Sequence, residues 1–235
     1  MKTLWNTIIY QPIYNTLIFV AQFVTFKDVG FAVVLVTILV RLAIYPLSKK
    51  SIISQYKMRA LEPKLKAIKA QGLTKEEETK ATFELYKTEK INPFSGCLYL
   101  LIQLPILFAL YFAFMGGVVQ PEHLYSFLNT DGLQNMFLGF IDITKPFLPL
   151  AILAGITQAI QAFLTPQPVA AGGDNGFQGQ FTKSLSLQTR YVLPLIIIFI
   201  SSKLAAAVAL YWVVANIFSI GQELYIRKTI GKQTI

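Results

Sequence analysis

The sequence contains little of the chemistry that enzymes and metal proteins use. It has one cysteine, Cys97, and one histidine, His123, in 235 residues. An internal disulfide is therefore impossible, and a zinc site built from cysteine and histidine is excluded. The GxxxxGK[ST], HExxH and GxSxG patterns are also absent. We therefore expect no catalytic residues, no metal, no cofactor and no direct nucleic-acid partner.

Charged residues are also scarce, at 14% of the chain, against roughly 25% in ordinary soluble domains. Hydrophobic residues make up 54%. Such a composition is typical of an integral membrane protein. We predict an all-α integral membrane protein with five transmembrane helices, an N-terminal interfacial helix and a cytoplasmic helical hairpin.

Five segments are predicted to enter the membrane, where about 20 residues span the hydrocarbon core. The predicted spans are 28–47, 96–118, 146–164, 190–202 and 203–222. The fourth has only 13 residues, so we expect it to form a tight hairpin with the fifth.

The charges of the connecting segments predict the orientation, because positively charged flanks stay in the cytoplasm. Segment 48–95 carries eleven Lys or Arg and six Glu, a net charge of +5. Segment 119–145 carries three acidic residues and one lysine, a net charge of −2. We therefore place 48–95, the flexible loop 165–189 and the tail 223–235 in the cytoplasm, and 119–145 and the N-terminus outside.

Residues 1–27 precede the first predicted span. Gln11, Asn15 and Gln22 fall on one stripe of a helix whose remaining surface is largely apolar. This pattern indicates an amphipathic helix on the outer membrane surface. A cleaved signal peptide, a sixth span and an uncleaved signal anchor are the alternatives.

The charged segment 48–95 has the pattern of a helical hairpin. Pro63 should kink its first arm or start a new helix, "QGLT" supplies a turn, and Thr74 with Glu77 fits a capping box for the second arm. One interpretation is a solvated hairpin without a partner. The other is a mobile arm that contacts anionic lipid headgroups, a client or a targeting factor.

Polar residues gather near the cytoplasmic ends of the predicted spans. At about 1.5 Å per residue, each lies within about 9 Å of that boundary. They are Arg41, Gln103, Gln158, Gln161 and Asn216. The outer halves of the spans are nearly free of such groups, and from Val29 onward the spans contain no Asp or Glu.

Arg41 is unfavourable inside an apolar run, by about 2.5 to 3.5 kcal/mol on insertion scales. In a structural interpretation, its side chain reaches the inner headgroups or donates to carbonyls and glutamines in a closed bundle. In a functional interpretation, it faces a hydrated cavity that opens only to the cytoplasm. A lone Gln or Asn in a span more often makes a helix–helix hydrogen bond than lines a groove. Trp212, beside Tyr211, can either face lipid or form part of the groove wall.

Four stretches resemble the YidC-type membrane protein insertases: "LVTILVRLAIYPLSKKS", "INPFSGCLYLLIQLPILFALY", "ILAGITQAIQAFLTP" and "VALYWVVANIFSIGQ". They occur in that family's order and spacing, over residues 10 to about 226. The resemblance implies five core helices around a hydrophilic groove in the inner leaflet. It assigns the groove's arginine to Arg41, and polar or aromatic groove positions to Gln158, Gln161 and Trp212.

The same resemblance implies that the groove accepts a client's hydrophilic tail while the client's apolar segment slides into lipid. The implied partners are nascent membrane proteins and anionic lipids, with a Sec-type translocon and the ribosome as further candidates. The implied location is the bacterial cell membrane. The sequence departs from the family pattern in having no large extracytoplasmic domain before the core, in the turn "SKLAAAVA" and in a short tail with three basic residues.

Two other classes of protein remain open on the residues alone. A small transporter or channel needs a polar path through both leaflets. A structural subunit of a membrane complex forms a dry, fully packed bundle. Water access at Arg41 separates the hydrated groove from the dry bundle.

Overall fold

The structure is a computed structural model that describes residues 2–92, 95–115, 118–166, 184 and 186–233. Over these residues the fold is all-α apart from one two-stranded sheet, which confirms the predicted class. The elements are α1 (Lys2–Trp5), η1 (Asn6–Tyr10), α2 (Gln11–Phe23), α3 (Val29–Ala43), α4 (Tyr45–Ala60), α5 (Glu62–Ala70), α6 (Lys75–Thr88), α7 (Ser95–Met115), η2 (Pro121–His123), β1 (Met136–Phe137), β2 (Ile141–Asp142), α8 (Leu148–Leu164), η3 (Gln188–Val192), α10 (Leu193–Ser201) and α11 (Ala206–Gln233).

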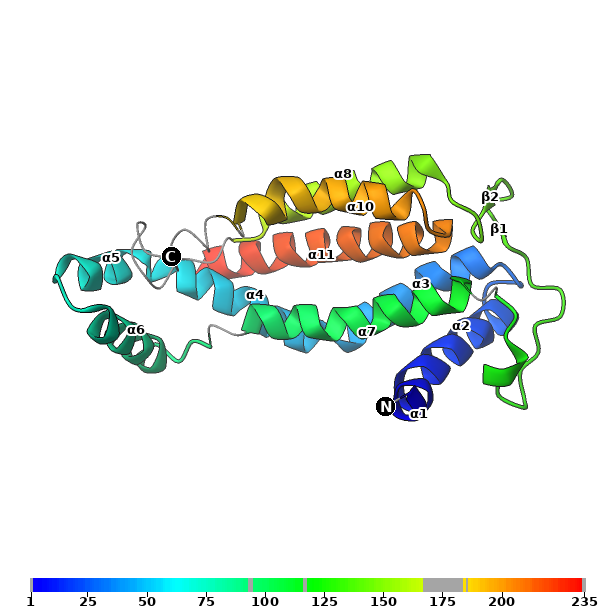
Figure 1. Cartoon of the computed structure of the whole chain (residues 1–235), viewed down its shortest axis with the longest axis horizontal. Coiled ribbons are helices and arrows are strands. Elements are labelled where there is room, and N and C mark those ends of the chain that lie inside the picture. Colours follow the sequence, from blue (N-terminus) through cyan, green and yellow to red (C-terminus); the bar gives the residue numbers. More distant parts are fainter. Residues whose placement is uncertain (1, 93–94, 116–117, 167–183, 185, 234–235) are drawn as a thin grey trace.

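The long helix α11 runs through the middle of the molecule, with α8 and α10 on one side and α3 and α7 on the other (Figure 1). The hairpin α5–α6 projects at one end, where α11 also finishes (Figure 1). We call this the hairpin end. The short strands and the N-terminal helices lie at the opposite end, which we call the strand end (Figure 1).

The first apolar helix ends earlier than the predicted span 28–47. α3 stops at Ala43, and α4 begins at Tyr45 with its axis turned by 62°. Pro46 explains the break, because proline has no N–H to donate to the preceding turn and is favoured in the first turn of a new helix. Arg41 therefore lies in the last turn of α3, where the partial negative charge of a helix C-terminus favours a cation.

The charged segment forms the two arms α5 and α6. A new helix begins at Glu62, so Pro63 starts a helix rather than kinking one. The predicted capping box is present, since Thr74 and Glu77 each bond the other's backbone N–H. One buried cluster holds the arms together: Met58, Leu61, Leu65, Tyr86 and Ile91. Mobility of this hairpin stays a prediction.

The polar stripe of α2 packs on the segment 119–145. The Asn15 side chain is 3% exposed. Its amide nitrogen donates to the His123 carbonyl at 2.8 Å, and its oxygen accepts from the Tyr125 N–H at 2.7 Å. On the outward side, α2 exposes Phe19 and Phe23. Contacts within the protein therefore satisfy Asn15, and the exposed face carries aromatic side chains.

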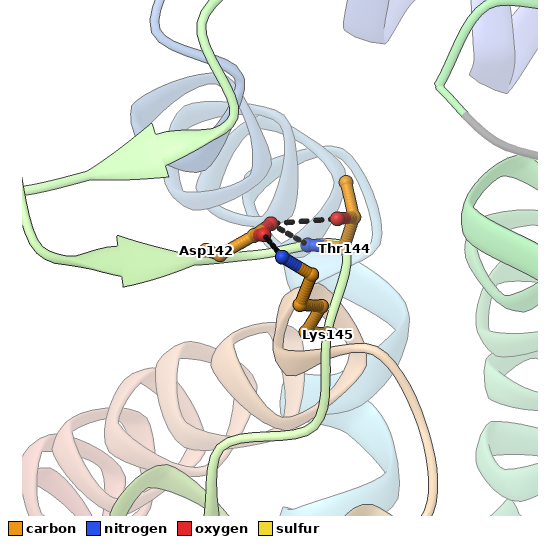
Figure 2. A network of polar contacts seen from close by, with 3 residues as sticks. All are labelled: Asp142, Thr144 and Lys145. Atoms are coloured by element: carbon orange, nitrogen blue, oxygen red, sulfur yellow. Dashed lines mark hydrogen bonds and ion pairs between the residues drawn. The ribbon is translucent and has the colours of Figure 1, made fainter.

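The loop after the strands holds the N-terminus of α11. The Ala206 N–H, which has no side-chain cap of its own, donates to the Lys145 carbonyl at 2.8 Å. Asp142 shapes this loop by pairing with Lys145 at 2.8 Å and accepting from the Thr144 hydroxyl at 2.6 Å (Figure 2). The hydrogen bonds from Lys145 and Thr144 lower the pKa of the Asp142 carboxyl to about 2. Backbone carbonyls thus replace a capping side chain at a helix end that would otherwise leave N–H groups without acceptors.

The short helix α10 packs mainly on α8, although a tight turn joins it to α11. Gly155 allows the close approach to α8. A Cβ atom there would lie 2.2 Å from Ile198 Cγ1 and 3.0 Å from the Pro194 carbonyl oxygen. The predicted hairpin with α11 is therefore present as a connection, but α8 supplies most of the packing surface.

Among the described residues, one helix is long and apolar enough to cross a membrane by length and composition, Ala206–Thr229. The bent pair α3 and α4 passes the same test together. Three shorter apolar helices are Gln103–Met115, Leu148–Leu164 and Gln188–Ser201. The count of five spans is not confirmed by this test. The predicted tail 223–235 is helical through Gln233 as part of α11, and most of the predicted loop 165–189 lies outside the described residues.

Replacing Gly155 with alanine should destabilise the pairing of α8 and α10. The added methyl group overlaps Ile198, and overpacking of this kind costs about 1 to 3 kcal/mol. We expect a lower thermal unfolding temperature for the detergent-solubilised protein, measured by circular dichroism.

Gly221→Ala is the matched control, because nothing lies within 4 Å of a Cβ at that position in α11. It should be neutral or stabilising, since alanine is the better helix former. Adding Ile198→Ala to Gly155→Ala should recover part of the loss. Equal destabilisation by the two glycine variants would contradict the assignment.

Candidate functional site

Two polar stripes face each other near the hairpin end of the bundle. Each stripe has the three- and four-residue spacing that places side chains on one helix face. Five of the six side chains are buried, and Gln55 is half-buried. The stripes are Ser48, Ser51 and Gln55 on α4, and Ser219, Gln222 and Glu223 on α11.

The stripes enclose a cavity of about 110 Å³ together with Ile52 of α4, Gln161 of α8 and Thr165 just beyond it. We call this cavity the polar pocket. Gln161 is thus the one residue among the six sequence-predicted site residues that lines it. Water occupies about 30 Å³ per molecule in the liquid, so the polar pocket has room for a few waters or for a small polar group.

Hydrogen bonds within the polar pocket satisfy some, but not all, of the polar atoms that line it. The Gln222 amide donates to the Ser48 hydroxyl, and the Gln55 amide donates to the Ser51 hydroxyl at 3.3 Å. Tyr56 of α4 hydrogen-bonds to the Glu223 carboxylate. The other carboxylate oxygen, Oε1, is buried and has no hydrogen-bond partner among the described residues. A buried oxygen of this kind is unfavourable in dry protein, so the pocket suits water or a polar guest.

Arg41 lies deeper in the bundle than the polar pocket. Its side chain is 6% exposed, and it interacts electrostatically with the hydroxyl of Tyr211 on α11. That hydroxyl is buried without a hydrogen-bond partner among the described residues. Tyr211 precedes Gln222 by eleven residues, which is about 16 Å along the helix axis. Arg41 and Tyr211 therefore form a second polar level above the pocket.

Asn216 lies between the two levels on α11 and joins that helix to α8. Its amide donates to the Thr157 hydroxyl at 3.2 Å and to the Ala154 carbonyl at 3.4 Å. The contact is a helix–helix hydrogen bond, one of the two roles that the sequence allows. Together with Tyr211 and the stripe of Ser219, Gln222 and Glu223, Asn216 places polar side chains on the inward face of α11 between residues 211 and 223.

The other three predicted residues do not line the polar pocket. Gln158 of α8 is half-buried. Trp212 is also half-buried and packs against the apolar core. Gln103 of α7 is half-buried, and its Oε1 is buried with no hydrogen-bond partner among the described residues.

Sequence reasoning missed most of the residues that line the polar pocket. The signal was present in the helical spacing of the serines after Pro46 and of the polar residues after Asn216. It was obscured because Lys49 and Lys50 make the start of α4 resemble a solvated linker. The residues missed are Ser48, Ser51, Gln55, Thr165, Ser219, Gln222 and Glu223.

Toward the strand end, the space between the helices is filled by an apolar core. The buried residues that α3, α7, α8 and α11 contribute to this core include Val29, Val33, Val36, Ala109, Ala113, Leu150, Ala206 and Leu210. The two ends of the bundle are therefore chemically different, with buried polar side chains at one end and close apolar packing at the other.

Comparison with known proteins relates this chain to membrane proteins. A family model described as "60Kd inner membrane protein" matches residues 19–233. A protein of Ectopseudomonas mendocina (strain ymp) named "Membrane protein insertase YidC" is 37% identical over 202 residues, which cover 86% of this chain and 31% of the relative.

Proteins of the same name from two other bacteria are also similar. That of Methylobacillus flagellatus is 34% identical over 226 residues, covering 96% of this chain and 37% of the relative. That of Pelobacter propionicus is 31% identical over 230 residues, covering 97% and 40%. The chain thus spans between 31% and 40% of the length of these relatives.

Ser48→Ala should destabilise the junction of α4 and α11. It removes the acceptor of the buried Gln222 amide, and a buried donor left without a partner costs about 1 to 3 kcal/mol. Denaturant unfolding in detergent should show the loss. In the double variant Ser48→Ala/Gln222→Leu, part of that loss should be recovered, because both polar groups are gone.

Ser54→Ala is the matched control on the same helix, since its hydroxyl bonds the Asn92 carbonyl in an exposed position. It should change stability by only a few tenths of a kcal/mol, about the effect of an ordinary surface substitution. Strictly additive effects of Ser48→Ala and Gln222→Leu would contradict the proposed coupling.

Proposed function

Since the chain belongs to the 60Kd inner membrane protein family, we propose that it is a membrane protein insertase and chaperone. It admits the hydrophilic tail of a client from the cytoplasm into the polar pocket and the level of Arg41. The client's apolar segment is then released into the bilayer. The observation that carries this proposal is the asymmetry of the bundle, with buried polar side chains at the hairpin end and an apolar core at the strand end.

In this proposal the bundle crosses a bacterial inner membrane five times, through α3, α7, α8, η3 with α10, and α11. The hairpin α5–α6 and the end of α11 are cytoplasmic, and the N-terminus and segment 119–145 are outside. The fourth span is short, because Gln188–Ser201 has 14 residues and measures about 21 Å at 1.5 Å per residue. A hydrocarbon core of about 30 Å must thin locally to match it.

Local thinning of the bilayer and the polar lining of the pocket both lower the free-energy barrier to moving a hydrophilic tail into the membrane. A hydrophilic tail crossing a bilayer loses its hydration, and each polar group without a partner costs several kcal/mol there. The polar pocket offers donors and acceptors over the inner part of that path. The remaining apolar distance then becomes shorter, so the tail meets a lower barrier without any covalent step.

Arg41 supplies a positive charge at the deep end of the polar path. Opposite charges about 4 Å apart attract by about 4 kcal/mol at an effective dielectric of about 20. The positive charge should therefore favour entry of acidic tails over neutral ones and disfavour entry of basic tails. Gln161 lines the entrance, while Gln158, Gln103, Asn216 and Trp212 are proposed to contact the tail as helices shift during insertion.

The proposed partners are nascent membrane proteins and the anionic lipids of the inner leaflet. Lys64 and Lys66 of α5 pair with Glu89 and Glu62, but their side chains are 60% and 70% exposed and so remain within reach of anionic headgroups. A Sec-type translocon and the ribosome are further proposed partners of the cytoplasmic face. A transporter or channel is disfavoured by the apolar core at the strand end, and a dry structural bundle by the buried oxygen of Glu223.

Cysteines introduced at 41, 158 or 161 should react with a small charged thiol reagent from the cytoplasmic side only. The background is a Cys97→Ser protein, and Ala113→Cys, in the apolar core, is the control that should stay unlabelled from both sides. The measurement compares labelling in right-side-out and inverted vesicles. Labelling from both sides would indicate a channel, and no labelling from either side would indicate the dry bundle.

Arg41→Ala should slow the insertion of clients with acidic tails most. Neutral tails should be affected less, because the polar pocket still shortens their apolar path. Arg41→Lys should retain much of the activity, since a point charge suffices. The assay is insertion of one single-span client with acidic, neutral or basic tails into proteoliposomes. An equal loss of insertion for all three tails in a folded Arg41→Ala protein would show that Arg41 has a structural role rather than acting as a counter-charge.

A further inference from the structure

A second and larger cavity lies at the strand end, far along the bundle from the polar pocket. It has a volume of about 440 Å³, within the range of about 300 to 1,000 Å³ that is usual for small-molecule sites. Its walls come from α1, η1, the end of α7 and the segment that follows. We call it the outer pocket, and the side chains that define its chemistry are Trp5, Tyr10, Phe112, Gln120, Glu122 and His123.

Hydrogen bonds between segments distant in sequence hold the walls of the outer pocket. The Tyr10 hydroxyl donates to the Gln120 side-chain carbonyl. The Gln120 amide in turn donates to the carbonyls of Phe112 and Ala113 at 3.1 and 3.2 Å. The Tyr14 hydroxyl accepts from the Gln120 N–H at 3.0 Å. The pocket is therefore built by the fold rather than by one loose loop.

The outer pocket has the composition of a site for an organic cation. Tyr10 and His123 meet edge to face, with ring centroids 5.0 Å apart and an interplanar angle of 87°. Trp5 adds a third ring to the lining. Aromatic faces attract ammonium groups, and tryptophan does so most strongly. Glu122 adds a carboxylate, and no lysine or arginine is among the described side chains of the lining.

One side of the outer pocket continues onto apolar surface. Phe112 and Met115 of α7 line it and are 46% and 68% exposed. Leu4 and Ile8, from the helical turns beside Trp5, are both 64% exposed. A ligand that places a cationic group between the rings can therefore lay hydrocarbon chains along this surface.

We propose that the outer pocket binds the ammonium headgroup of an aminophospholipid from the outer leaflet. The ammonium group lies between Trp5 and His123 with Glu122 as its counter-charge, and the acyl chains run over Phe112 and Met115, while the buried ring of Tyr10 supports His123 from behind. The assignment to the outer leaflet rests on the membrane orientation proposed above. Binding itself does not depend on insertase activity, so the two proposals can fail separately.

The test measures binding of short-chain lipids to the full chain in detergent by isothermal titration. The probes are dihexanoyl phosphatidylethanolamine, dihexanoyl phosphatidylglycerol and free phosphoethanolamine. The native chain should prefer the ethanolamine lipid over the glycerol lipid by about five-fold, the scale of one partly desolvated cation–π contact. Free phosphoethanolamine should bind more weakly than the lipid, because it has no chains to bury.

Two variants of the outer pocket should reduce the preference to less than about two-fold. Trp5→Leu keeps an apolar side chain and removes the π face. Glu122→Gln removes the charge at an exposed position, where substitutions usually change stability by less than about 0.5 kcal/mol. Trp5→Phe should restore part of the preference lost in Trp5→Leu. Asp131→Asn, which removes one exposed carboxylate from the same outer segment, is the matched control and should leave the preference unchanged.

Three results would overturn the proposal. The native chain could bind both lipids equally, or the preference could survive in both Trp5→Leu and Glu122→Gln. Free phosphoethanolamine could also bind as tightly as its lipid, which would identify the ligand as a soluble amine. Glu122→Gln keeps the test decisive if Trp5→Leu fails to fold.

Discussion

The packing of α11 against α8 and α3 is the contact on which the rest of the structure depends. Near the strand end, α11 presents alanines that are almost completely buried, including Ala206, Ala207 and Ala209. Small side chains allow neighbouring backbones to approach closely, which is how helices associate where the hydrophobic effect is weak. Near the hairpin end, the same helix presents Ser219, Gln222 and Glu223, and there it meets α4 through polar groups.

This change of chemistry along a single helix makes the two ends of the bundle different. Alanines and branched residues fill the space at one end, and side chains with unmet hydrogen-bonding capacity line a small cavity at the other. Close packing of small and apolar side chains can by itself hold helices together in a membrane, and each interhelical hydrogen bond adds only about 0.6 kcal/mol there on average. The polar side chains at the hairpin end are consistent with the proposal that this end of the bundle accepts polar guests.

Segments beside the bundle keep its strand end in place by hydrogen bonds as well as by apolar burial. Asn15 and Tyr14 tie the N-terminal helix to the segment after α7. The Lys145 carbonyl caps α11, on a loop that Asp142 shapes. The hydrogen bonds of Gln120 with Tyr10 and Tyr14 also hold the walls of the outer pocket, so the strand end carries a candidate ligand site.

The sequence by itself determined the class of protein, the positions of most helices and the presence of buried polar residues, because hydrophobic length and helical spacing are local properties. It also placed the capping box at Thr74, where both partners lie within one turn. The bend after Ala43 was readable in principle from Pro46, a local signal.

Only the tertiary structure decided which polar side chains meet. Ser48 and Gln222 are 174 residues apart and come together because α4 turns by 62° toward α11. Likewise, Tyr10 reaches Gln120 through the packing of the N-terminal helix on α7. Helix spacing predicts the face on which a side chain lies, but the neighbour of that face depends on the packing of the whole bundle. The members of both pockets could therefore not be predicted from the order of residues in the chain.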